Sequence, residues 1–472
     1  MTSKGRAPRP GSGAARPDHL GPLVFASAVA AMGGFLSGYD SAVINGAVVA
    51  IRSHYAIGSV TLAHVMAIAL IGAAAGAVVA GRLADRVGRV RCMQIAAAVF
   101  TVSVIGSALP FSLWELAFWR IVGGFAIGMA LVSGAAYIAE VAPSAYRGRL
   151  GSFQPAAAVV GFAVSQLVNW GLLKAVGGNQ RGRLLGLEAW QVMLVVTIVP
   201  TAVYGLLTFA IPESPRFLLS VGRRDRAREI LAMVEGKNVD LDARVAEIEA
   251  AMKHEYGSTF KDLLGGAFLL KPIVWTGIGL AVLQQFVGIT PSFYYCSLLW
   301  QSVGVCAEEA FFYSFLISIA NILGVVIAMF FVDRIGRKPL TTIGSVGMVV
   351  GLALKAWTFS HPLVGGMLPA PHGLIGLIAA HAFVFFFSLS WGPVVWVLLS
   401  EMFPDNIRAA ALGTALCIHW LAAWVVTSSF PTLAEWDLSM TYVIYAIFAA
   451  FSLLFVLKFV KETKGKTLEE MT

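Results

Sequence analysis

Three residues that are charged at neutral pH lie inside long apolar stretches of the sequence, Asp40, Arg120 and Lys355. A charged side chain is costly in such a stretch, so each is a candidate functional group. A carboxylate that faces an arginine can take up a proton when substrate or water enters, and release it later. Asp40 and Arg120 therefore predict proton coupling, with a static ion pair between two helices as the alternative. Lys355 lies near the end of its stretch, and its ammonium is expected to reach the membrane surface.

Polar and aromatic residues form a second group inside apolar stretches. Gln284 and Gln285 are adjacent amides that need hydrogen-bond partners, because lipid offers none. Amides pair donors with acceptors as hydroxyl groups require, and tryptophan faces stack on the C–H side of a sugar ring. Contact between helices without a ligand is the alternative. The candidate substrate-binding residues are Gln154, Gln284, Gln285, Thr290, Asn321, Trp391 and Trp420.

Charged residues also gather where apolar stretches meet arginine-rich loops. The segment 85–89 recurs as 333–337, and Glu140 before Arg147 recurs in the second half of the chain. Such charges can join two helix bundles and separate when one side opens. The alternative is that they only orient the chain in the membrane. The predicted gating residues are Asp85, Arg86, Arg89, Glu140, Arg147, Asp333, Arg334, Arg337, Glu401 and Arg408.

The composition indicates which elements position these residues. The 472 residues are 58% hydrophobic and only 13% charged, whereas a soluble domain has about 25% charged residues. Twelve apolar runs reach the length of about 20 residues that a spanning helix needs. The sequence therefore predicts an all-α membrane protein with twelve transmembrane helices. Four cysteines are too few for a disulfide scaffold, and basic residues scattered between apolar runs do not form a nucleic-acid face.

Lysine and arginine in the short loops predict the orientation of the chain. They are concentrated before the first run, in every second loop, and after the last run. Both termini are therefore expected to be cytoplasmic, in a multi-pass protein of the plasma membrane. The stretch with Lys174, Arg181 and Arg183 is the exception to this pattern.

Matches between the two halves, in the same order, indicate a duplicated unit of six spans. Besides the charged segments, Pro212–Arg216 after the sixth run is echoed by Lys461–Gly465 after the twelfth. No G-x-x-x-x-G-K-[ST] motif occurs, so neither ATP nor a cofactor is expected. The predicted division is a cytoplasmic tail, a six-helix bundle, a cytoplasmic linker with short helices, a second six-helix bundle and a second cytoplasmic tail, at residues 1–20, 21–212, 213–268, 269–460 and 461–472.

The chain resembles the sugar porters of the major facilitator superfamily, near bacterial proton–glucose and proton–xylose symporters. The resemblance is carried by Gly38–Asp40, Asp85–Arg89, Arg120–Gly124, Tyr137–Glu140, Pro212–Arg216, Gln284–Ile289, Asp333–Pro339, Trp391–Pro393 and Lys461–Gly465. It implies two bundles that rock around a central site, with the proton carried at Asp40 and Arg120 as its partner. It also implies that sugar is held at Gln284, Gln285, Asn321 and Trp391.

Several positions depart from the usual pattern of this family. Thr197 stands where proton-coupled relatives can carry an acid, and the changes nearer the expected pocket make it roomier and less polar. These are Ser37, Pro155, Thr290, His419 and Ala423. The leading prediction is a monomeric symporter of protons and a glucose- or xylose-like monosaccharide. The alternatives are a transporter of a cyclitol, modified sugar or natural product, including export, then a ligand sensor and a channel.

Overall fold

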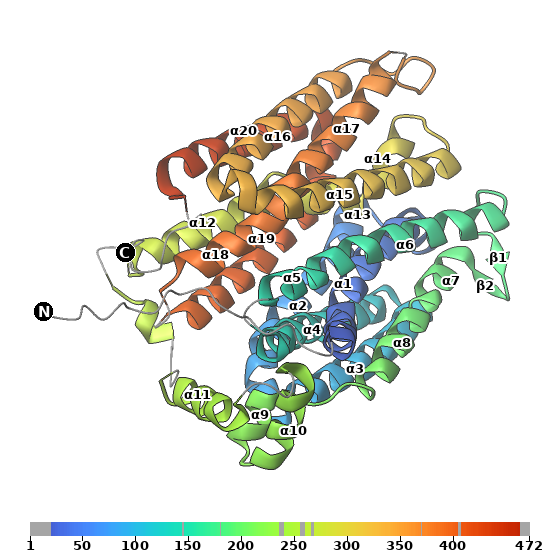
Figure 1. The fold of residues 1–472 in the computed structure, drawn as a ribbon. Helices are drawn as coiled ribbons and strands as arrows, with labels where there is room; N and C mark the ends of the chain where they lie inside the picture. Colours follow the sequence, from blue (N-terminus) through green and yellow to red (C-terminus); the bar gives the residue numbers. More distant parts are fainter. Residues whose placement is uncertain are drawn as a thin grey trace, which may run out of the picture.

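The structure is a computed structural model that describes residues 20–462, apart from 144–145, 180, 236–239, 255–259, 266–268, 370 and 405–406. The predicted terminal tails lie almost wholly outside the described residues. The described chain is nearly all helix, and its two halves occupy separate parts of the molecule (Figure 1). Twelve segments within it are long and apolar enough to span a membrane, as the sequence predicts.

The first six spans form one bundle. Its helices are α1 (Leu20–His54), α2 (Ser59–Val87), α3 (Arg89–Ala108), α4 (Leu113–Val141), α5 (Arg147–Gly151), α6 (Phe153–Ala175), α7 (Ala189–Val196) and α8 (Ile198–Thr208). A short hairpin, β1 (Arg183–Leu184) and β2 (Leu187–Glu188), leads from α6 into α7.

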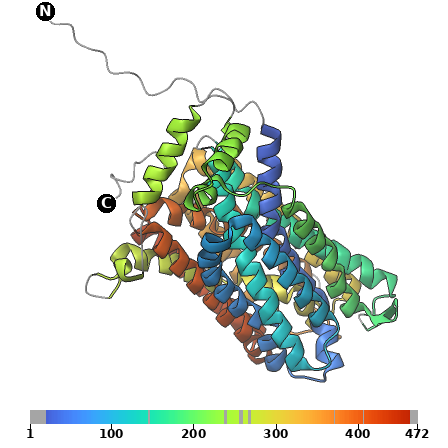
Figure 2. The same ribbon diagram turned by 90° about the horizontal axis from the view of Figure 1, so that it is seen from below.

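Short helices connect this bundle to the second one. They are α9 (Pro215–Ser220), α10 (Arg224–Glu235), α11 (Leu241–His254) and the 3-10 helix η1 (Phe260–Leu263). The green helices of this connection lie at the same end of the molecule as the start of α1 (Figure 2). We call this end the inner end and the opposite one the outer end.

The last six spans form the second bundle. Its helices are α12 (Pro272–Phe286), α13 (Ile289–Tyr294), α14 (Cys296–Ser302), α15 (Ala307–Ile335), α16 (Arg337–Phe359), α17 (His372–Leu389), α18 (Trp391–Met402), α19 (Arg408–Trp436) and α20 (Leu438–Phe459). Two of its spans are interrupted. The seventh breaks at Gly288 and Tyr295, and the tenth breaks at Ser390.

Gly288 explains the first of these breaks. Its φ of 81° lies in the left-handed region, and a Cβ there would come within 2.4 Å of the Tyr445 ring. Only glycine adopts this conformation without strain. Because glycine has no Cβ, it also leaves room for the Tyr445 ring. Interrupted helices inside a bundle leave backbone groups available to side chains and ligands. The candidate substrate site described below therefore lies near these breaks.

The same tight turn occurs at the inner end of both bundles. Gly88 links α2 to α3 with φ 104°, and Gly336 links α15 to α16 with φ 105°. A Cβ on Gly88 would meet a carboxylate oxygen of Glu213 at 2.3 Å, and one on Gly336 would meet Glu462 at 2.8 Å. Each carboxylate accepts hydrogen bonds from the first amides of the following helix. Corresponding turns with corresponding caps support the duplication read from the sequence.

The buried apolar residues fall into two clusters. The larger cluster contains the core of the second bundle together with outer-half residues of the first, such as Tyr39, Leu70 and Trp190. The smaller cluster contains inner-half residues of the first bundle and of the linker, such as Tyr137 and Leu218. The bundles therefore share a core at the outer end, and no shared core joins the described residues at the inner end.

Candidate functional site

The first candidate site is an ion pair between the first and fourth spans. Asp40 on α1 accepts two hydrogen bonds from Arg120 on α4, of 2.7 Å from Nη1 and 3.0 Å from Nη2. The two side chains are 8% and 3% exposed. A bidentate geometry offsets part of the cost of burying both charges. The structure thus brings together the two residues predicted for proton coupling.

The second bundle reaches this ion pair through one tyrosine. Tyr294, at the end of α13, is 3% exposed and interacts with Ser41, Arg120 and Asp40. Its ring lies where the interrupted seventh span meets α1. A change of charge at Asp40 therefore changes the electrostatic environment of Tyr294 on α13 of the opposite bundle.

Polar residues of α12, α13 and α19 form a second cluster. Gln284 donates from Nε2 to the carbonyl of Trp391, the first residue of α18, at 2.7 Å. Gln285 contacts Nε2 of His419 at 3.2 Å and accepts a hydrogen bond from Thr290. The adjacent amides therefore have partners, and those partners come from three different spans.

Two buried polar atoms of this cluster have no hydrogen-bond partner among the described residues. They are Oε1 of Gln284 and Nε1 of Trp420. Buried polar atoms are nearly always satisfied, so two left open in one region indicate a place for a ligand or water. One acceptor and one donor suit the hydroxyl groups of a small polar molecule.

The remaining predicted binding residues have other partners. Trp391 is fully buried and donates from Nε1 to Ser345, so its indole packs inside the second bundle. Asn321 accepts a hydrogen bond of 2.6 Å from Ser388. Gln154 donates to the carbonyl of Leu131 within the first bundle.

Polar contacts that the sequence analysis missed join the bundles at the outer half. Ser297 on α14 donates from its backbone amide and from its hydroxyl to Oδ1 of Asn45 on α1, both at 2.9 Å. Asn45 in turn donates to Gln166 on α6. The signal was present, since Asn45 is an amide inside an apolar stretch, as Gln284 is. Nearer the outer surface, Arg52 lies 4.0 Å from Glu435.

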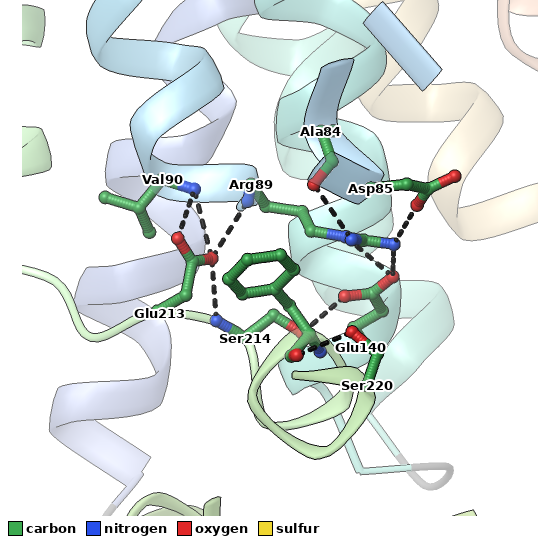
Figure 3. Close-up of polar contacts among 9 residues, drawn as sticks. Ala84, Asp85, Arg89, Val90, Glu140, Glu213, Ser214 and Ser220 are labelled. Atoms are coloured by element: carbon green, nitrogen blue, oxygen red, sulfur yellow. Dashed lines mark hydrogen bonds and ion pairs between the residues drawn. The ribbon is translucent and has the colours of Figure 1, made fainter. Parts of the chain in front are cut away.

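Three of the five gating charges predicted in the first bundle form one inner-end network (Figure 3). Arg89 contacts Asp85 at 2.8 Å and Glu140 at 3.0 Å. Glu140 also accepts a hydrogen bond from Ser214, which follows Glu213 at the end of the sixth span. Arg86 is exposed, and the side chain of Arg147 lies outside the described residues.

The second bundle repeats this arrangement. Arg337 contacts Glu401 at 2.8 Å, as Arg89 contacts Glu140. Arg408 donates to the carbonyl of Phe403, and Arg334 is exposed. The side chain of Asp333 lies outside the described residues. The ion pairs of Arg89 with Asp85 and Glu140, and that of Arg337 with Glu401, each join helices of the same bundle.

Lys355 does not reach the membrane surface, so that expectation was wrong. Its side chain is buried in α16 and 2% exposed. Nζ lies 3.9 Å from the centre of the Tyr442 ring and 5.7 Å from that of Phe383. The side chain packs on these aromatic faces inside the bundle, although its place near the end of the span predicted an exposed position.

Comparison with known proteins places this geometry in a family. The model of the sugar (and other) transporter family matches residues 26–472. The chain belongs to this family, the sugar porters of the major facilitator superfamily. A glucose transport protein of Synechocystis is 45% identical to this sugar porter over 454 residues, 95% of this chain and 97% of the relative. The D-xylose-proton symporter of Escherichia coli is 33% identical over 476 residues, 94% of each chain.

Solved structures confirm the fold of this sugar porter. The xylose transporter of E. coli in a partially occluded inward-open conformation has a TM-score of 0.82 at 32% identity, with 95% of this chain and 100% of that chain covered. The same symporter bound to 6-bromo-6-deoxy-D-glucose has a TM-score of 0.79 at 33% identity, with 95% and 98% covered. The prediction of an all-α membrane protein with twelve spans in two bundles is confirmed, as is a multi-pass location in the cell membrane.

Proposed function

We propose that this sugar porter is a symporter of protons and a monosaccharide, glucose- or xylose-like, that works by alternating access. The observation that carries the proposal is the buried bidentate pair of Asp40 and Arg120 beside Tyr294 of the opposite bundle. The names of the relatives support it, since they include a glucose transport protein, a D-xylose-proton symporter and an arabinose-proton symporter.

The ion pair offers a physical route for coupling. A proton on Asp40 removes one charge of the pair and leaves Arg120 buried without its counter-charge, which is unfavourable. The free energy of that state falls if the bundles move so that water or another group reaches the guanidinium. Because Tyr294 lies within electrostatic range of both side chains, protonation of Asp40 and movement of the seventh span are linked.

The substrate site lies in the cluster of Gln284, Gln285, Thr290 and His419, with Trp420 beside His419. Its open polar atoms suit sugar hydroxyls. We place Asn321, Trp391 and Gln154 around this cluster as residues that reach the substrate in other conformations of the cycle. The inner-end networks then act as gates that join the bundles when the inner side closes.

The remaining assignments complete the proposal. The protein acts as a monomer without a cofactor, and both termini face the cytoplasm. Residues 21–212 and 269–460 move as the two bundles, and residues 213–268 link them on the cytoplasmic side. The position of α9, α10 and α11 at the inner end supports this division (Figure 2).

Transport into proteoliposomes tests the proposed function. Purified protein is reconstituted, an inward proton gradient is imposed, and uptake of labelled glucose and xylose is followed with and without a protonophore. We expect accumulation above equilibrium that the protonophore abolishes. Gradient-independent equilibration would contradict symport, and the absence of uptake of both sugars by folded protein would point to a cyclitol or a modified sugar.

A further inference from the structure

Lys355 is a buried titratable group that the proposed coupling at Asp40 does not use. Its Nζ atom lies against the faces of Tyr442 on α20 and Phe383 on α17, and the side chain is 2% exposed. Among the ion pairs of the described residues, none joins Lys355 to a carboxylate. Aromatic faces offset only part of the free energy that an ammonium loses when it leaves water.

A row of aromatic rings connects Lys355 to the helix that closes the outer side. The centre of the Tyr442 ring lies 6.4 Å from that of Phe430, which stacks on Tyr295 at 5.5 Å. Tyr295 directly precedes α14, and Ser297 of α14 makes the hydrogen bonds to Asn45 that join the two bundles. Movement of α14 is therefore expected to disturb the packing that keeps water away from Lys355.

The other groups around Lys355 leave it as the main titrating charge of this region. The titratable groups that face it are Cys296 from α14, His381 from α17 and Tyr442 from α20. Nδ1 of His381 is already bonded to the carbonyl of Leu377. Among the described residues of α15 and α18, which also pack on α16, no titratable side chain interacts with Lys355.

We propose that Lys355 is a second proton-binding site, placed in the second bundle and linked to the opening of the outer side through α14. The neutral amine is favoured in the closed arrangement described here, where the group is dry. Movement of α14 away from α1 admits water, which favours the ammonium. Protonation of Lys355 therefore favours the open outer side. The inference rests on the alternating access proposed above, but on no particular substrate.

The test measures the outer opening directly, without sugar. Fluorescent labels are attached through non-natural amino acids at Phe111 and Val364, which are 96% and 67% exposed in outer loops of the two bundles. Energy transfer is recorded in nanodiscs from about pH 5 to about pH 9, which spans the range where a buried lysine can titrate. The protein carries Asp40→Asn, so the first proton site is silent.

Asp40→Asn alone is expected to open progressively as the pH falls. Adding Lys355→Met should leave the outer side closed at every pH. Adding Lys355→Arg instead should leave it open at every pH, because a guanidinium keeps its charge. Lys458→Met, which removes an exposed lysine of α20, is the matched control and should keep the pH response.

Two results would overturn the proposal: a pH-independent signal in Asp40→Asn, or an unchanged pH response after either substitution of Lys355. If the methionine variant fails to fold, the arginine variant decides alone. If the wild type accumulates no sugar while the labels keep their pH response, the proposed symport is refuted and this inference stands.

Discussion

At the scale of single residues, one rule picks out three groups that behave differently. Charges inside apolar stretches are costly, which singles out Asp40, Arg120 and Lys355 in the sequence. Two of them neutralise each other through a bidentate contact, and the third is held by aromatic faces. The sequence singles out these three residues as functional candidates. It does not identify the side chains that contact them, because those side chains come from helices that only the fold brings together.

Asp40→Asn is expected to abolish proton-driven accumulation and to leave substrate exchange measurable. The amide preserves the shape of the carboxyl group, keeps one hydrogen-bond acceptor for Arg120, and cannot cycle a proton. Accumulation and counterflow in proteoliposomes check this prediction. Asp437→Asn is the matched control, because Asp437 caps α20 at its outer end and asparagine caps a helix equally well. Accumulation that survives in Asp40→Asn would show a structural ion pair.

Gln284→Ala is expected to weaken substrate binding by about 1 kcal/mol or more, close to fivefold in Kd. The change removes the open Oε1 atom and the hydrogen bond that orders the carbonyl of Trp391. Binding is measured by calorimetry with the transported sugar. Gln94→Ala, on the inner part of α3, should leave the affinity unchanged. Equal affinities for both variants would remove Gln284 from the site.

Amides inside apolar spans are the most informative residue-level signal. Gln284 and Gln285 could be predicted to need partners, and Asn45 follows from the same reasoning. What the sequence did not reveal is the identity of those partners, such as the carbonyl of Trp391 or the hydroxyl of Ser297. These depend on helix breaks and on the conformation of the whole molecule.

At the scale of elements, the composition of the sequence predicts the membrane spans, but it does not predict where those spans are interrupted. Twelve apolar runs predict twelve spans, since length and hydropathy alone decide whether a segment can cross the membrane. The breaks at Gly288 and Ser390 fall inside continuous apolar runs. Gly288 needs its left-handed φ because the Tyr445 ring packs against it, and that ring lies more than 150 residues away in the sequence.

The outer hairpin provides a prediction for pH and stability. Burial raises the pKa of Glu188, but hydrogen bonds from Trp190, Arg181 and His54 outweigh it, so the pKa lies below the ordinary 4.5. The charged form is therefore stabilised by folding. This contribution is complete above the ordinary pKa and is lost as the pH falls through the lowered one.

We expect wild type to melt at a higher temperature than Glu188→Gln near neutral pH. The difference should shrink between about pH 5 and about pH 3, where the carboxylate of the wild type becomes protonated. Thermal unfolding in detergent at a series of pH values measures it. Glu435→Gln, which removes an exposed outer carboxylate, serves as the control. A gap that does not change with pH would contradict the assigned hydrogen bonds.

At the scale of the whole molecule, the buried apolar residues that the structure describes give the two bundles a shared core at the outer end. The larger apolar cluster contains residues of both bundles in their outer halves, and the hydrogen bonds between Asn45 and Ser297 add polar contacts in the same region. The duplication, the two bundles and the family could be predicted from the sequence. The conformation could not, because one sequence must adopt both outward- and inward-open states.

Ser297→Ala is expected to shift the population toward an open outer side by about fivefold, the equivalent of one hydrogen bond of roughly 1 kcal/mol. The change removes the hydroxyl bonds to the carbonyl and Oδ1 of Asn45 and keeps the backbone contact. Energy transfer between labels at Phe111 and Val364 measures the shift. Ser302→Ala is the control, because its hydroxyl bonds within α14 only. No shift relative to this control would show that the apolar core alone closes the outer side.

The paired caps on α3 and α16 also bear on how the protein is made. Each cap comes from a residue far along the chain, 124 positions after Arg89 for Glu213 and 125 after Arg337 for Glu462. A ribosome delivers each glutamate only after the remaining spans of its bundle have been synthesised. Since domains generally fold as units, the first one made first, each bundle receives this final link as its last span is completed. The first half can therefore be secured in the membrane before the second half has been translated.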